Sequence, residues 1–136
     1  MFSALKDFQS ELVAVLRSDA ALTAALGNSN IFDGAPKATE PPYIVIERLD
    51  AREIDGQMIK LLRVEIDWAI WLNQMHRNNG FTIAKTLDDT LMTASPVSPS
   101  FKLISYLSKR TQSRIDRKTG WTKIVLSSVF SIEDLT

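Results

Sequence analysis

The chain has no cysteine and a single histidine, His76. Without cysteine there is no disulfide bond and no thiolate ligand for a metal ion. A lone histidine with no carboxylate or cysteine pattern beside it lacks the other ligands that a metal needs. It also lacks the oriented partner that acid–base catalysis needs. The sequence therefore predicts no metal and no cofactor, and we expect His76 to be structural or exposed.

Long apolar runs are missing too. No stretch of eighteen or more apolar residues is present, so no transmembrane helix and no membrane contact is expected. The first nineteen residues lack a basic segment followed by an apolar block and a small-residue cleavage site. We therefore expect them to be part of the fold rather than a signal peptide.

The patterns that mark common enzymes are also missing. Five glycines are dispersed singly, which excludes a glycine-rich phosphate loop, and no serine stands in a nucleophile-elbow pattern. Two pairs of adjacent carboxylates occur, Asp88–Asp89 and Glu133–Asp134. Neighbours on a helix or strand point apart, so neither pair forms a catalytic dyad. The chain is predicted not to be an enzyme.

What the sequence does contain is typical of one globular domain, which we expect to span residues 1–136. The apolar fraction is 45%, and positive and negative charges are mixed. A chain of this length buries roughly two thirds of the surface that its unfolded form exposes, so it can form its own core.

One stretch, Leu61–Leu72, organises the prediction of the fold. Apolar and other residues alternate along it with a period of two, which indicates a strand with one buried face and one wetter face. The predicted buried face consists of Leu62, Val64, Ile66, Trp68, Ile70 and Leu72. The other face begins with Arg63, Glu65 and Asp67, which we expect to meet water or a partner. It ends with Ala69 and Trp71, which we expect to lie under another element.

The remaining patterns predict an α+β fold with an antiparallel, twisted sheet of four strands arranged as two hairpins. N-terminal helices and one helix between the hairpins pack on this sheet. Residues 31–36 are interpreted as a short extended piece, residues 50–60 as a charged loop, and residues 133–136 as a fraying tail. The predicted helices are 3–17, capped by Ser3, then 20–26 and about 79–93; the predicted strands are 43–49, 61–72, 101–114 and 121–132.

Net charge is zero, but it is unevenly distributed. Residues 101–123 carry seven basic side chains against Asp116 alone, whereas residues 31–67 carry eight acids against five bases. Such asymmetry can mark a nucleic-acid surface, two complementary faces of a head-to-tail oligomer, or a solvated hairpin. The aromatic residues of the basic hairpin interleave poorly with its bases, so direct binding of nucleic acid is not favoured.

Several short sequence motifs occur in a fixed order along these predicted elements. A helix runs into the segment D-A-A-L-T-A-A-L-G at residues 19–27, followed by I-F-D-G-A-P at 31–36 and P-Y-I-V-I at 42–46. A long strand with tryptophans, a helix and the turn D-R-K-T-G-W at 116–121 complete the series. Over nearly its whole length the chain resembles the tail-completion or tail-terminator proteins of long-tailed phages, prophages and gene-transfer agents.

That resemblance implies a structural protein of the virion tail, present in the host cytoplasm during assembly. It implies a six-fold ring of identical subunits that caps the tail tube and joins it to the head connector, so the tube protein and the connector protein are the expected partners. The alternative is a nucleic-acid-binding or other adaptor protein that uses the basic hairpin 101–123. From charge and position, the candidate contact residues are Arg52, Asp55, Arg63, Glu65, Asp67, Arg110, Arg114, Arg117 and Lys118.

Overall fold

The computed structural model describes residues 1–54 and 58–136. Its helices and strands follow one another as α1 (Phe2–Ser18), α2 (Ala20–Leu26), β1 (Ile31–Phe32), β2 (Tyr43–Ile54), β3 (Leu61–Leu72), α3 (Asn78–Thr93), β4 (Phe101–Asp116) and β5 (Trp121–Asp134). No helix in the described ranges is long and apolar enough to cross a membrane.

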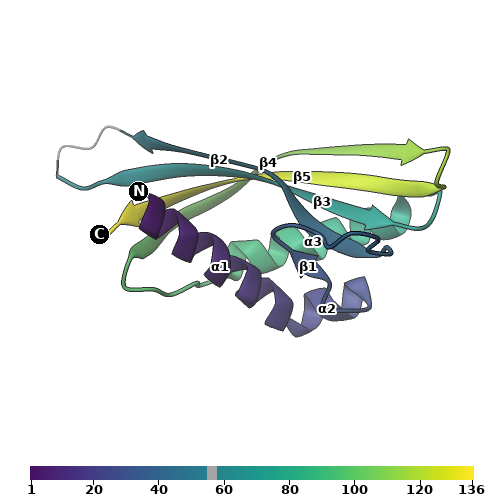
Figure 1. Cartoon of the computed structure of the whole chain (residues 1–136), viewed down its shortest axis with the longest axis horizontal. Coiled ribbons are helices and arrows are strands. Elements are labelled where there is room, and N and C mark those ends of the chain that lie inside the picture. The colour runs from purple at the N-terminus through teal and green to yellow at the C-terminus, as the bar shows by residue number, and fades with distance from the viewer. Residues whose placement is uncertain (55–57) are drawn as a thin grey trace.

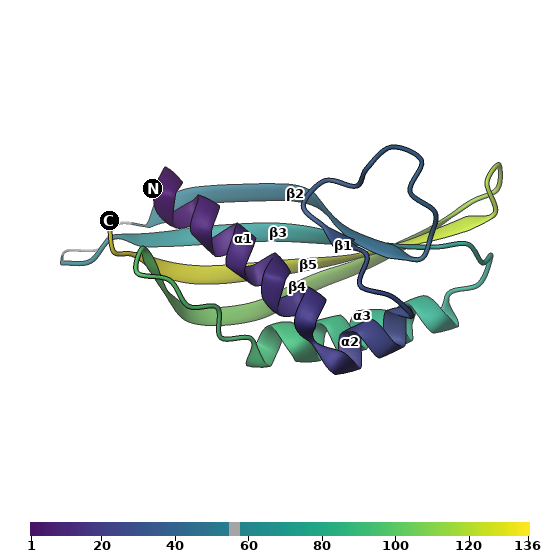
Figure 2. The same ribbon diagram turned by 60° about the horizontal axis from the view of Figure 1, so that its bottom comes forward.

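The helices form one layer and the sheet forms the other (Figure 1). All three helices lie on the same face of the sheet, and no helix covers the opposite face, which we call the outer face. Figure 2 shows α1 crossing the strands obliquely, with α2 and α3 toward the β4 side. The expected α+β class with helices packed on a twisted sheet is therefore confirmed.

The expected number of strands was wrong. The sheet has five strands in the order β1-β2-β3-β5-β4, and β1 pairs in parallel with β2 through Ile31–Ile44 and Phe32–Val45. The four longer strands are antiparallel as predicted. Two residues are too few to show the alternation that identifies a strand. The sequence of residues 31–36 therefore did not predict that Ile31 and Phe32 pair with β2.

The central strand has the predicted bounds and the predicted buried face. Each of the six apolar residues from Leu62 to Leu72 at every second position is at most 2% exposed. They face a matching row on β5, where Ile124, Leu126, Ser128, Phe130 and Ile132 are buried. Trp68 donates from Nε1 to the Ser128 hydroxyl at 3.0 Å, and that hydroxyl donates to the Ile66 carbonyl at 2.9 Å. Every polar atom of this buried contact is thus satisfied.

Strand β2 is longer than predicted and changes face midway. It runs on to Ile54 instead of ending at Leu49, so half of the predicted charged loop belongs to the strand. A bulge shifts the register between Ile46, which lies opposite Trp68, and Arg48, which lies opposite Asp67. Because a bulge adds one residue to one strand, the side chains beyond it change faces. Arg48 consequently points to the outer face.

The helix boundaries agree closely with the prediction, but several details differ. Asp19 caps α2 by accepting from the Leu22 N–H at 2.9 Å, and Gly27 ends the helix at φ 90°. Helix α1 begins at Phe2 without a side-chain cap, so Ser3 is not its cap. Helix α3 begins after Arg77, also without one.

The inward face of α3 was partly mispredicted. The helical spacing of Phe81, Ala84, Leu87, Leu91 and Met92 predicts that all five face the core, but Phe81 and Met92 are 45% and 64% exposed. The side chains that pack inward are those of Ile83, Ala84, Leu87 and Leu91. Gly80 also lies inward, so the buried stripe is rotated by one position from the one expected.

The C-terminal residues are held rather than frayed. β5 continues to Asp134, whose backbone N–H donates to the Lys60 carbonyl at 2.8 Å. The Asp134 side chain is buried and pairs with the Met1 amine at 2.9 Å. The predicted fraying from residue 133 was therefore wrong, because the end of β5 is tied to the neighbouring strand and to the start of α1.

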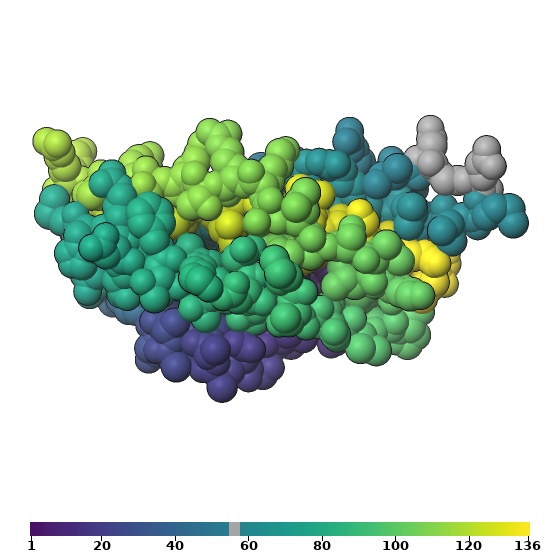
Figure 3. Space-filling view, turned by 180° about the vertical axis from the view of Figure 1, so that it is seen from behind, coloured from purple at the N-terminus to yellow at the C-terminus, as the bar shows by residue number. Residues whose placement is uncertain are grey.

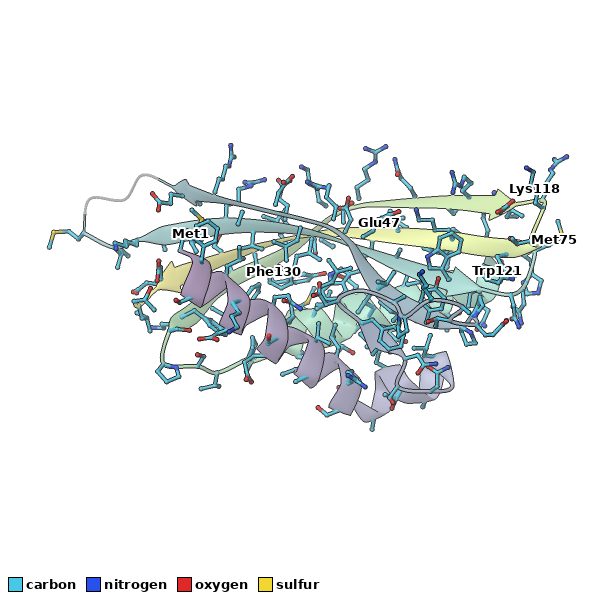
Figure 4. All side chains as sticks on the ribbon, in the orientation of Figure 1. Met1, Glu47, Met75, Lys118, Trp121 and Phe130 are labelled. Carbon is cyan, nitrogen blue, oxygen red and sulfur yellow. The ribbon has the colours of Figure 1, made fainter. Side chains whose placement is uncertain are left out.

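Three aromatic rings join the helical layer to the sheet. Phe8 of α1 contacts Phe101 of β4 and Phe130 of β5 edge-on, with ring centroids 5.3 and 5.2 Å apart. Figure 4 shows Phe130 between the sheet and α1. The core thus lies between the two layers.

Candidate interaction surface

Charged side chains gather on the outer face over the middle of the sheet. Arg48 of β2 donates from Nε to Asp67 at 2.8 Å and from Nη2 to Glu65 at 3.4 Å, and its Nη1 pairs with Asp50. Glu65 also accepts from Arg63 at 3.1 Å and lies 3.5 Å from Lys109 Nζ. We call Arg48, Asp50, Arg63, Glu65, Asp67 and Lys109 the outer-face cluster.

The cluster favours the charged forms of Glu65 and Asp67. Hydrogen bonds from Arg63 and Arg48, together with the charge of Lys109, outweigh the effect of burial and lower the pKa of Glu65. Burial would raise the pKa of Asp67, but hydrogen bonds led by the one from Arg48 outweigh it and lower that pKa. The same contact with Asp67 raises the pKa of Arg48. Most of the charge on this part of the face is thus balanced within the chain.

The sequence located three members of this cluster and missed the central one. Arg63, Glu65 and Asp67 share the outer face of β3, as predicted. Arg48, Asp50 and Lys109 were not predicted. Strict alternation from Ile44 and Ile46 places Arg48 on the buried face, and only the bulge reverses it. Lys109 lies at a second bulge, between Ser108 and Arg110 of β4.

The other predicted residues are spread over the molecule. Arg52 lies opposite Arg63 across the β2–β3 pair, and Arg110 lies on β4 opposite Ser127, in the same row as Asp67. Asp55 lies outside the described residues. Arg114, Arg117 and Lys118 belong to the far end of the β4–β5 hairpin.

That hairpin end carries positive charge from two segments. Arg114, Arg117 and Lys118 are exposed there, and a shallow cleft is lined by Arg114 and Arg117 together with Arg77 from the start of α3. Arg77 is held in place because its Nε donates to the Ser113 hydroxyl at 2.7 Å. Figure 4 shows Lys118 and Met75 at this same end. We call Arg77, Arg114, Arg117 and Lys118 the basic end.

The turn itself is well ordered. The Asp116 carboxylate accepts from the Lys118 N–H at 3.0 Å, and the Gly120 N–H donates to the Asp116 carbonyl at 2.8 Å. Gly120 has φ 73°, a left-handed conformation that favours glycine. The basic end therefore projects from the sheet on a defined turn.

The basic end lies far from Asp50 and Glu53, the acidic residues in the second half of β2. β3 pairs with β5 from Leu61–Glu133 to Leu72–Thr122, so the turn at 117–120 follows one end of β3 and residues 58–60 precede the other. Figure 1 shows the start of β3 and the β4–β5 turn at opposite ends of the sheet. A contact between them therefore needs two molecules.

The tryptophans near the basic end are engaged with neighbours. Trp71 stacks with Tyr43 at 6.4 Å and meets Trp121 edge-on at 6.1 Å between ring centroids. Lys123 lies 5.4 Å from the Trp71 ring and pairs with Glu47. Ala69 is buried, as expected, but the Trp71 end is covered by these side chains rather than by another element. Such rings are not a free platform for stacked bases.

Within residues 1–54 and 58–136, no three His, Asp or Glu side chains are grouped so that they could hold a metal ion. His76 follows Met75 in the connection after β3 and is exposed. The charged features of the surface are the outer-face cluster and the basic end.

Comparison with known proteins agrees with this architecture. A solved structure titled "Virion of native gene transfer agent (GTA) particle" contains a chain that superposes with a TM-score of 0.76 at 20% identity, covering 88% of this chain and 90% of that one. No curated protein matches the sequence. The family model described as "Tail completion protein gp17" matches residues 10–130. The chain therefore belongs to the tail completion protein gp17 family.

Proposed function

We propose that this chain is a non-enzymatic tail terminator, which forms a ring on the head-proximal end of a tail tube and joins it to the head connector. Membership of a tail completion family carries the proposal, because it supports a structural role in the tail of a phage or gene transfer agent. The fold shared with a chain of a gene transfer agent virion agrees with that role.

The distribution of charge supports the proposal. A subunit of a closed ring needs two different surfaces that meet head to tail, and a terminator also needs separate surfaces for the tube and the connector. The basic end and the outer-face cluster differ in charge and lie on different parts of the sheet. The positive charge of the basic end, led by Arg114 and Arg117, is therefore assigned to a protein partner with an acidic surface.

The first test is the molar mass in solution, measured by light scattering over a range of concentrations. A ring of six chains of 15.2 kDa has a mass of about 91 kDa. That mass supports the ring, whereas a stable dimer contradicts it. If the chain is a monomer, purified tail tubes are added, and failure to bind their ends contradicts the proposal.

The second test concerns the basic end. The variant R114E/R117E should give overlong or headless tails in assembling particles, because its partner contact becomes repulsive. The matched control is K6E/R17E, which reverses two exposed bases of α1. Normal particles from R114E/R117E remove the basic end from the mechanism.

The alternative, a nucleic-acid adaptor, makes a different prediction. Binding to phosphates depends steeply on salt, so a wild-type chain that uses the basic end should bind DNA at low salt and lose it as salt rises. Absence of binding at low salt rules out this alternative. The engaged tryptophans favour that outcome.

A further inference from the structure

The sheet has two edges that lack a neighbouring strand within the described residues. β4 is at one edge over its whole length, Phe101–Asp116. On the other side, β1 pairs only with Ile44 and Val45, so β2 is open from Glu47 to Ile54. An open edge presents unpaired N–H and C=O groups and is a template for another strand.

The β4 edge is guarded only in part. Soluble proteins usually guard a long edge with charged side chains, bulges or a covering segment, and β4 has bases and two register shifts, between Leu103 and Ser105 and between Ser108 and Arg110. Ile104 and Leu107 are nevertheless 51% and 67% exposed on β4. Lys109 does not guard the edge, because it reaches over the outer face to Glu65 at 3.5 Å. Figure 3 shows the green residues of β4 at the surface above α3.

The two edges suit each other in direction. β2 and β5 run one way and β3 and β4 run the other, since β2–β3, β3–β5 and β4–β5 are all antiparallel. Two copies placed side by side in the same orientation therefore bring β4 of one against β2 of the next as an antiparallel pair. The open half of β2 is also level with the apolar part of β4, because both lie beside the Leu61–Trp68 half of β3 and its β5 partners.

Their charges are complementary as well. β4 carries four bases against Asp116. The open half of β2 carries three acids against two bases. Like copies of β4 would repel each other, whereas β4 and β2 attract. The bases are Lys102, Lys109, Arg110 and Arg114, and the acids are Glu47, Asp50 and Glu53. Lys109, Glu47 and Asp50 already pair within the chain, with Glu65, Lys123 and Arg48 in turn. The attraction across the contact is therefore assigned to Lys102 and Arg110 on β4 and to Glu53 on β2.

From these observations we infer that β4 of one copy adds to the open half of β2 of a second copy, which extends the sheet from subunit to subunit. The inference rests on the proposed ring and names its subunit contact. A second copy fits better than an unrelated strand, because the chain itself supplies both edges with opposite charge and compatible direction. Such a contact is heterologous and can close into a ring.

The test uses two variants, each with one edge blocked by lysines. I104K/L107K blocks β4, and E53K/I54K blocks β2; lysine on an edge opposes strand pairing. F2K/A24K is the matched control, because it places two lysines at exposed apolar positions of α1 and α2, away from both edges and from the basic end. Circular dichroism and the urea midpoint of each variant show whether it is folded, and light scattering gives the mass.

Wild type and the control should give about 91 kDa, and each blocked variant alone should give the 15.2-kDa monomer. An equimolar mixture of the two blocked variants should stop at a dimer of about 30 kDa, because it retains one intact contact and lacks the other. Misfolding cannot produce that result, since neither variant associates by itself.

Each other outcome overturns the inference. If both variants still form the large assembly, the ring stands but its contact lies elsewhere. If the folded mixture stays monomeric, the two edges do not pair. If the wild type is monomeric at every concentration, the edge contact is overturned as well, and binding to tail tubes then decides the proposed function separately.

Discussion

Gly80 of α3 packs closely against Leu72 of β3 and Ile124 of β5. A Cβ on this residue would lie 2.7 Å from Ile124 Cγ1 and 2.9 Å from Leu72 Cδ1. Alanine would improve helix propensity by about 1 kcal/mol, but the overpacking that it causes costs roughly 1–3 kcal/mol. Gly80→Ala should therefore destabilise the protein by about 1 kcal/mol in urea unfolding. Gly34→Ala, where nothing lies within 4 Å of the new Cβ, is the control and should change little.

Because of Arg48, the stability that Glu65 and Asp67 contribute depends on pH. The lowered pKa values of Glu65 and Asp67 mean that their contribution to stability is complete above the unfolded values of about 4. It is lost as pH falls through the lower folded values, because the unfolded chain then binds more protons. Arg48→Met should flatten this loss below about pH 4 in urea unfolding measured across pH. A slope equal to that of the wild type would show that Arg48 does not hold the two carboxylates; Arg52→Met is the matched control.

At the scale of elements, Asp19 joins two helices. Its carboxylate accepts from the Leu22 N–H at 2.9 Å and from the Thr90 hydroxyl of α3 at 3.2 Å. Asp19→Ala removes the cap of α2 and should lower the free energy of unfolding by about 1 kcal/mol. Asp19→Asn keeps an acceptor and should retain most of the stability. Equal losses in thermal unfolding of the two variants would argue against the cap.

The bulge in β2 is a feature that the alternation of apolar and polar residues does not predict. The alternation of β3 could be read from Leu61–Leu72, because its two neighbours in the sheet pair with it along its whole length. β2 obeys the same alternation only up to Ile46. Its shift depends on the partner strand, which the sequence of β2 does not specify. The central member of the outer-face cluster was missed for that reason.

At the scale of the whole molecule, Phe8 connects the first helix with the last two strands. It is fully buried between Phe101 and Phe130. Phe8→Ala should destabilise the protein by about 3–5 kcal/mol, because it leaves a cavity between the two layers. Phe2→Ala makes the same change on the same helix at a residue that is 81% exposed. A similar loss for both variants in urea unfolding would contradict this role of Phe8.

The sequence by itself determined the α+β class, the buried face of β3, the bounds of α2, and the resemblance to tail completion proteins. These follow from local periodicity and from the order of the elements, which act through neighbours along the chain. Only the tertiary structure decided that β1 joins the sheet, that Arg48 unites the outer-face cluster and that Asp134 is buried. The tertiary structure also decided that the β4 edge and half of the β2 edge have no neighbouring strand within the described residues. Those features depend on which distant segments pair and in which register, and a local pattern carries no record of either.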